Sequence, residues 1–175
     1  MSALILTLDE RRDRLGLKGP RAAQWLAAQG MELPPAANTW AQTGADLVAR
    51  LGAAEFFLED GAEGTTIRRL AASANEHPPG VYPVLREDWA FELGGDGVHE
   101  VLAQVCNVNF ASLVLDAQPL IMTLMIGVAV LVVPRIAAGE RAYRIWCDPT
   151  FGPYLDESLG TVVSECGGRH TGVSQ

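Results

Sequence analysis

The chain has 175 residues, which is enough for one domain or for two small, tightly packed halves. Its composition is 49% hydrophobic and 19% charged, which excludes intrinsic disorder and predicts large buried faces. The formal net charge is −8, and an acidic protein repels phosphate backbones. We therefore expect no nucleic-acid partner.

The N-terminal segment is not typical of a signal peptide, because it lacks a basic region and reaches Asp9 and Glu10 early. The three cysteines, Cys106, Cys147 and Cys166, form no C-x-x-C pair and have no histidine at metal-ligand spacing. They predict free, buried thiols and no metal site. Such thiols fit a reducing compartment, so a cytoplasmic location is expected.

A first series of elements is predicted within residues 1–76. Leu15 and Leu17 alternate with their neighbours as in a strand with one buried face. Gly19 then permits a turn, and Pro20 suits the first position of a helix. Three short strands and a second helix are predicted to follow, at residues 38–42, 46–51, 55–59 and 65–73.

The proline-rich segment 77–88 is predicted to be a stiff connector. A second series covers residues 89–166 and consists of a strand at 89–93, a helix from Val98, strands at 121–126, 128–133 and 142–147, and a closing helix. Asp96 is the predicted cap of the first of these helices. Thr150 is the predicted cap of the closing helix, because it places Pro153 in the first turn. Residues 167–175 are predicted to be a flexible tail.

One apolar run, Leu120–Pro134, is long enough to raise the question of a membrane segment. It is shorter than the ~20 residues that a membrane-spanning helix needs. Gly127 divides it into two stretches of strand length. The run therefore predicts two adjacent core strands and no contact with a membrane.

The two series of elements correspond at a constant offset. Leu17 aligns with Leu93 and Gly19 with Gly95, and the same order of six elements follows in each series. The sequence therefore predicts an α+β fold of two pseudo-symmetric βαβββα halves, joined by the connector.

Little in the sequence is typical of catalysis. The turn Gly94–Gly97 matches neither the P-loop nor the dinucleotide-binding spacing and predicts a tight turn. The histidines, His77, His99 and His170, are far apart, and no serine or cysteine has the context of an activated nucleophile. We assign no catalytic residue and no metal ligand. The one candidate for a cofactor contact is Asp46, at the mouth of a predicted strand, and a solvated turn residue is the alternative.

Three segments of the chain stand out together: Leu15–Leu33, with Leu-x-Leu-Lys-Gly-Pro followed by Trp-Leu, then Leu47–Leu58, with Glu-Phe-Phe-Leu, and Arg141–Leu155. In this order they resemble the gamma subunit of the sarcosine oxidases. The resemblance covers residues 13–165, and the order and spacing of the segments carry it.

This resemblance implies the folate-binding fold found in the amino-terminal part of the aminomethyltransferases (T-proteins). It also implies an accessory subunit of a heterotetramer that demethylates sarcosine. FAD, FMN, NAD and tetrahydrofolate would be bound by the partner subunits and none by this chain. N-methylglutamate dehydrogenases carry a similar small subunit, which is an alternative assembly.

The chain departs from the aminomethyltransferases at the paired acids before the strand that corresponds to Leu47–Leu51. It has Ala45 and Asp46 there, so only one acid is present. This departure favours a non-catalytic chain with a role in assembly. Two alternatives are a free-standing folate-binding or aminomethyltransferase-like protein, in which Asp46 contacts the ligand, and a structural homodimer.

Overall fold

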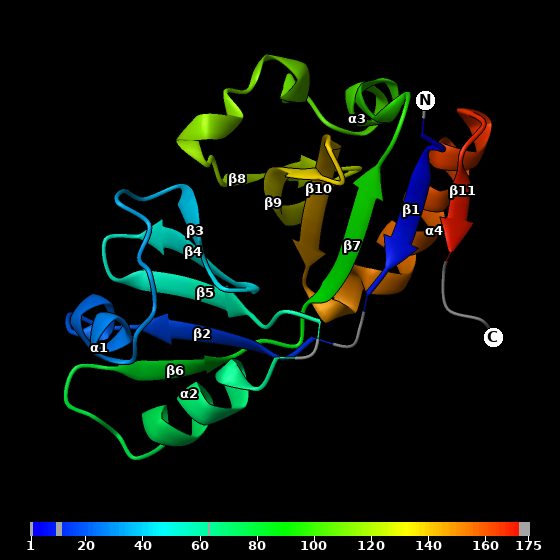
Figure 1. Cartoon of the computed structure of the whole chain (residues 1–175). Coiled ribbons are helices and arrows are strands. Elements are labelled where there is room, and N and C mark those ends of the chain that lie inside the picture. The colour runs from blue at the N-terminus through cyan, green and yellow to red at the C-terminus, as the bar shows by residue number, and fades with distance from the viewer. Residues whose placement is uncertain (1, 10–11, 63, 172–175) are drawn as a thin grey trace. The chain divides into compact units, whose positions relative to one another are not determined.

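The computed structural model describes residues 2–9, 12–62 and 64–171 (Figure 1). The chain forms two compact units. The N-terminal unit comprises residues 11–87, and the C-terminal unit comprises residues 1–10 together with residues 88–175. Each unit has its own sheet, α-helices and hydrophobic core, so the chain is an α+β protein.

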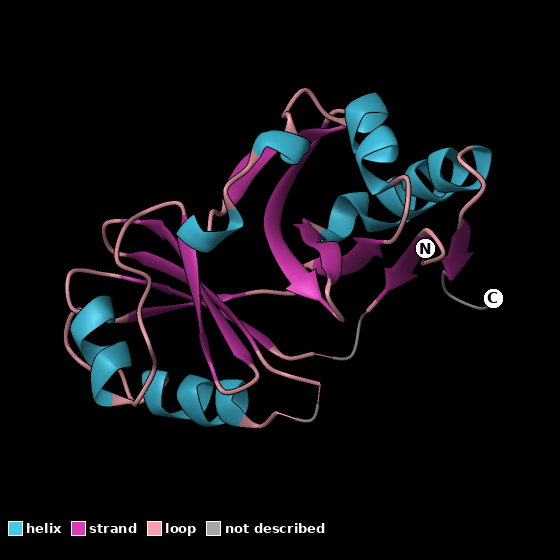
Figure 2. Cartoon of the chain, turned by 45° about the horizontal axis from the view of Figure 1, so that its top comes forward, coloured by secondary structure: helices cyan, strands magenta, loops and turns pink. Residues whose placement is uncertain are grey.

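The N-terminal unit is built on an antiparallel sheet with the strand order β3-β4-β5-β2-β6. Figure 2 shows its helices on the same side of the strands. The elements are β2 (Arg14–Lys18), α1 (Ala22–Ala28), β3 (Thr39–Thr43), β4 (Asp46–Gly52), β5 (Glu55–Glu59), α2 (Thr66–Ala74) and β6 (Tyr82–Leu85).

Alternate residues of the strands form the face of this sheet that packs against its helices. Leu17 of β2 and Phe56 of β5 are directly opposite each other and pack with Leu26 of α1 in one buried cluster. The turn after β2 requires glycine, because Gly19 has φ +124° and a Cβ there would lie 2.3 Å from the carbonyl oxygen of Gly80. The strand-turn-helix unit predicted from the sequence is therefore present.

The C-terminal unit has the strand order β11-β1-β7-β10-β9-β8. Pairing is antiparallel except between β1 and β11. The strands and α-helices are β1 (Ile5–Leu8), β7 (Trp89–Gly94), α3 (Val98–Val105), β8 (Ile121–Met125), β9 (Val128–Ala137), β10 (Glu140–Cys147), α4 (Gly152–Glu165) and β11 (Arg169–Thr171). Short 3-10 turns lie at Phe110–Ser112, Leu115–Ala117 and Pro149–Phe151.

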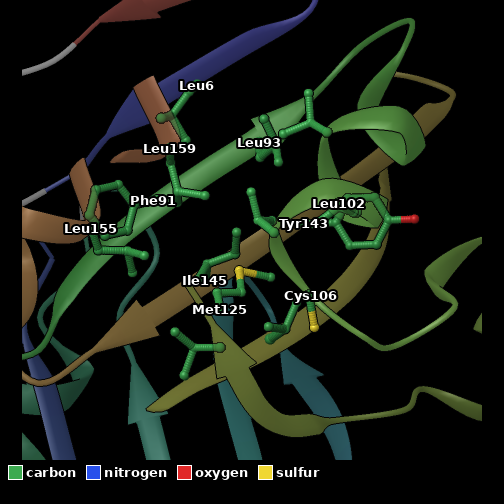
Figure 3. Close-up of a cluster of buried hydrophobic side chains, with 14 of the residues drawn as sticks. Leu6, Phe91, Leu93, Leu102, Cys106, Met125, Tyr143, Ile145, Leu155 and Leu159 are labelled. Carbon is green, nitrogen blue, oxygen red and sulfur yellow. The ribbon is translucent and has the colours of Figure 1, made fainter. Parts of the chain in front are cut away.

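The helices of this unit pack on one face of its sheet. Figure 3 shows Leu155 and Leu159 of α4 beside Phe91 of β7, and Leu102 of α3 near Tyr143 of β10. All five side chains have 1% exposure or less. The spacing of Leu155 and Leu159 places both on the same helical face, which explains why this stretch is helical in the core.

The apolar run Leu120–Pro134 forms two adjacent strands, as the sequence predicts. β8 and β9 pair antiparallel, and Ile126 and Gly127 make the turn between them. Within the described residues, no helix combines the length and the apolar character that crossing a membrane requires. Gly127 has φ +82°, a conformation that glycine adopts without strain.

The units divide the chain differently from the predicted halves. Strand β6 lies inside the predicted connector 77–88 and pairs with β2, and β11 lies inside the predicted tail 167–175 and pairs with β1. Strand β1 belongs to the C-terminal unit, where it pairs with β7. These strands are short and their partners are distant in the sequence, so local patterns do not reveal them. Pro83 is tolerated in β6 because this strand lies at an edge.

Two predicted helix caps are wrong. Helix α3 follows Gly97 and has no side-chain cap, so Asp96 does not have that role. At the closing helix, the carboxylate of Asp148 accepts a hydrogen bond of 2.8 Å from the amide of Thr150 in a preceding 3-10 turn. Pro153 still lies in the first turn of α4, as predicted.

The predicted order of elements is present in both units. β2-α1-β3-β4-β5-α2 corresponds to β7-α3-β8-β9-β10-α4. β6 pairs antiparallel with β2, and β1 pairs antiparallel with β7, so these two strands occupy equivalent places in the two sheets. In the chain, β6 directly precedes β7 of the other unit, and β1 directly precedes β2 of the other unit.

Candidate functional site

Asp46, the candidate for a cofactor contact, lies at the first position of β4. Its Oδ1 accepts a hydrogen bond of 2.9 Å from the backbone amide of Gly61, in the segment after β5. The side chain therefore ties the start of one strand to the end of its neighbour. This structural contact accounts for an acid at the strand mouth, where the sequence left open either a ligand contact or a solvated turn.

A second acid near Asp46 is more deeply buried and was not singled out by the sequence. Asp60 follows β5 and is 2% exposed, and its Oδ1 accepts a hydrogen bond of 2.9 Å from the amide of Ile67 in the first turn of α2. Its Oδ2 is buried and has no hydrogen-bond partner among the described residues. Asp60 therefore caps α2 from a distance, since Thr65 at the N-cap position makes no side-chain cap.

The surroundings of Asp60 favour its neutral form. Burial raises the pKa of this carboxyl above its ordinary value, the hydrogen bond from Ile67 opposes the rise, and the negative charges of Asp46 and Asp13 add to it. Buried acids with raised pKa values are common in active sites, but they also occur in structural networks. Here the contacts connect β4, β5 and α2 within one unit.

In the C-terminal unit, two histidines each contact a polar side chain, and the first of these pairs is His99 with Tyr143. His99 Nε2 lies 2.6 Å from the Tyr143 hydroxyl, and the two rings meet edge to face at 5.9 Å. Burial, together with the charge of Arg141, lowers the pKa of His99, and burial raises the pKa of Tyr143. Both groups are thus neutral near pH 7, and one neutral hydrogen bond joins α3 to β10.

A cleft of about 350 Å³ lies beside this pair at the turn before α3. The turn contains the glycines that the sequence singled out, and Gly95 is required because a Cβ there would lie 2.1 Å from the carbonyl oxygen of Ala3. Arg141 also lines the cleft, but so do the acids Asp96 and Glu140. This mixed charge does not suit a phosphate group, in agreement with the interpretation of the turn as structural.

The second pair, His170 with Asp156, borders a cleft of about 860 Å³ along α4. His170 Nε2 lies 2.7 Å from Oδ1 of Asp156 and connects β11 to the helix. Two glycines of α4 make room for rings in the cleft wall: a Cβ at Gly160 would lie 2.4 Å from His170, and one at Gly152 would lie 2.2 Å from Trp89. A glycine inside a helical pattern is the one sequence signal for this packing.

The three cysteines are free thiols, and two of them are buried. Burial raises the pKa of the Cys147 thiol to about 12, and the charges of Asp88 and Asp148 add to the effect. Cys106 is also buried, and Cys166 is partly buried and accepts a hydrogen bond from Gln104. No group of three or more His, Cys, Asp or Glu side chains within the described segments could hold a metal ion.

Comparison with known proteins gives the class of fold. No protein-family model matches the chain, and no curated protein matches it. Among solved structures, a chain of the heterotetrameric sarcosine oxidase from Corynebacterium sp. U-96, in complex with pyrrole 2-carboxylate, matches with a TM-score of 0.72 and 22% identity. The match covers 97% of this chain and 87% of that chain.

A second solved structure is the glycine cleavage system aminomethyltransferase T from Bartonella henselae, with a TM-score of 0.69 and 14% identity. The match covers 98% of this chain and 48% of that one, so this chain spans about half the length of the aminomethyltransferase. At these identities the likeness shows the fold. The chain has an aminomethyltransferase-like fold that is shared with a chain of a heterotetrameric sarcosine oxidase.

Proposed function

We propose that this chain is an accessory, gamma-type subunit of a heterotetrameric sarcosine-oxidase-like complex, with a structural role in its assembly. The match to a chain of the Corynebacterium sarcosine oxidase carries the proposal, because it extends over 97% of this chain and 87% of that chain. The two chains are therefore of similar length, whereas the aminomethyltransferase is about twice as long.

The local chemistry of the candidate site supports a non-catalytic role. Asp46 is engaged by the amide of Gly61, and the Cys147 thiol is held neutral by burial. A side chain that is already hydrogen-bonded or held neutral within the fold is poorly placed to act on a substrate. In this proposal FAD, FMN, NAD and tetrahydrofolate are bound by the partner subunits, and the complex is cytoplasmic and oxidises sarcosine.

We also propose that the two units are copies of one duplicated βαβββα element. The shared order of elements and the equivalent places of β1 and β6 support this duplication. In this view the architecture was retained from a folate-binding ancestor, while the chemistry at Ala45 and Asp46 was lost.

Purification of the native protein tests the proposed role. A tagged chain isolated from its own host should bring flavoprotein subunits with it, and the purified complex should oxidise sarcosine. If N-methylglutamate is oxidised in place of sarcosine, the partner is a dehydrogenase of that type. A chain that emerges without a flavoprotein contradicts the proposal.

The second candidate is a free-standing folate-binding or aminomethyltransferase-like protein, which the match to aminomethyltransferase T favours. Titration of the isolated chain with tetrahydrofolate separates the two functions. Tight binding that Asp46→Ala abolishes supports the second candidate. Asp46→Asn is the matched control, because it keeps an oxygen that can accept from Gly61 and so preserves the loop.

A further inference from the structure

Strand β8 is the last strand of the C-terminal sheet and pairs with β9 alone among the described strands. Ile126 and Gly127 form a two-residue turn in which both residues have positive φ, +48° and +82°. In such a hairpin the residues next to the turn, Met125 and Val128, exchange backbone hydrogen bonds. Along β8, the amides and carbonyls that point toward β9 are therefore those of every second residue, Met125, Thr123 and Ile121.

The intervening residues of β8, Met122 and Leu124, direct their amides and carbonyls away from β9. Their side chains are also exposed, by 51% and 59%. No other described strand pairs with these backbone groups, so the same two residues combine outward backbone groups and exposed apolar side chains at one edge of the sheet. This combination is a template for a further strand.

Natural edge strands normally carry a feature that prevents pairing, such as a charge or a proline. The edge strand β6 of the N-terminal sheet has Pro83, which lacks an amide. By contrast, no charged residue occurs between Gln118 and Pro134, the segment that contains β8 and its turn. A sheet edge without charge or proline is expected where another chain covers that edge in the functional assembly.

We infer that the outer edge of β8 is the docking site for an extended, uncharged strand of a larger partner subunit. This inference rests on the proposed function, which supplies the partner. The strand would hydrogen-bond to the backbone of Met122 and Leu124, and its apolar side chains would cover theirs.

Interface size indicates a wider contact than this edge alone, and net charge favours a different partner over a second copy of this chain. A specific interface covers about 800 Å² on each partner, and two exposed side chains provide only a small part of that. The edge must therefore belong to a wider contact. Two copies would also bring together net charges of −8 each, which oppose association.

Residue-resolved hydrogen exchange on the isolated chain and on the native complex tests the inference. The amides of Met122 and Leu124 should exchange freely in the isolated chain and about tenfold slower or more in the complex. The amide of Thr123 is the internal control, because its bond to β9 protects it in both samples. A complex in which Met122 and Leu124 still exchange freely overturns the inference and leaves the proposed function standing.

A matched pair of proline variants makes the same test by mutation. Leu124→Pro removes an outward amide and should leave the fold intact while weakening assembly about tenfold or more, whereas Thr123→Pro removes a bond to β9 and should lower the unfolding temperature. Leu124→Lys keeps the backbone and adds a charge, so it should weaken assembly even if the proline variant misfolds.

The other outcomes are equally decisive. Assembly that is unchanged in both Leu124 variants overturns the inference. A chain that purifies alone rejects the proposed function and the partner strand with it. A dimer of this chain that Leu124→Pro converts to a monomer identifies a second copy as the occupant and also overturns the inference.

Discussion

The two units each use a carboxylate to hold a helix, but in different surroundings. Asp60 of the N-terminal unit is 2% exposed and accepts from an amide of α2, whereas Asp156 of α4 keeps 17% of its side chain exposed and pairs with His170. Burial raises the pKa of the Asp60 carboxyl in the first contact. Water screens the second, so it contributes little to stability. Burial of the partners, more than their identity, decides how each contact responds to mutation and pH.

The largest effects are expected from the two hydrophobic cores. Phe56→Ala and Phe91→Ala each remove a fully buried ring and should destabilise the protein by about 3–5 kcal/mol. Because the rings belong to separate clusters, Phe56→Ala should first reduce hydrogen-exchange protection in β5 and α2, and Phe91→Ala in β7 and β10. Equal losses across both units for either variant would show that the cores are not independent.

A smaller effect is expected at Asp60. Asp60→Ala leaves the amide of Ile67 without its acceptor and should cost about 0.5–2 kcal/mol in urea unfolding. Asp60→Asn keeps an acceptor without a buried charge, so at pH 7 its stability should equal or exceed that of the wild type. A large loss in the Asn variant would show that the ionised carboxylate has a partner that this account lacks.

The pH dependence at Asp60 follows from its raised pKa. The proton binds more tightly in the folded state, so the stabilising contribution is complete below the ordinary value of 3.8 and is lost as pH rises through the higher folded value. The stability of the wild type relative to Asp60→Asn should therefore fall over that interval. Urea unfolding from pH 3 to pH 7 measures this difference in the free energy of unfolding. If the wild type becomes more stable relative to Asp60→Asn as the pH rises, the predicted direction is wrong.

At Gly160 two effects of similar size oppose each other. Glycine to alanine in a helix normally stabilises by up to about 1 kcal/mol. Here the added Cβ would lie 2.4 Å from the His170 ring, so the ring must move away from Asp156. Gly160→Ala should therefore give no gain or a modest loss of melting temperature. The control Ser158→Ala, at a partly buried position of the same helix, should give a small gain.

The smallest effect is expected for the contact between His170 and Asp156. A double-mutant cycle with His170→Gln and Asp156→Asn should give a coupling free energy of about 0–1 kcal/mol, because both side chains reach water. A coupling above that range would place the pair among the buried contacts and remove the contrast with Asp60.

Local patterns predicted much of the fold. The βαβββα order, the paired strands at Gly127 and the position of Pro153 follow from alternation, helical spacing and the restrictions on glycine and proline. The strands β1, β6 and β11 were not predicted, because each is short and pairs with a strand far away in the sequence.

The candidate site was less predictable, since its contacts join distant residues. Asp46 was identified, but its contact with Gly61 is not visible in a sequence pattern. His99 was one of three histidines far apart in the sequence and had no predicted partner, whereas it bonds Tyr143, which is 44 residues away. The buried acid Asp60 gave no signal, because its burial depends on packing between β5 and α2.

The mass and the absorbance of the native particle test the central claim most directly. Light scattering on the tagged chain purified from its host should give a heterotetrameric particle far above the 18.7 kDa of the single chain, with flavin absorbance under the same peak. A peak at the mass of one or two copies of this chain, without flavin absorbance, would contradict the account.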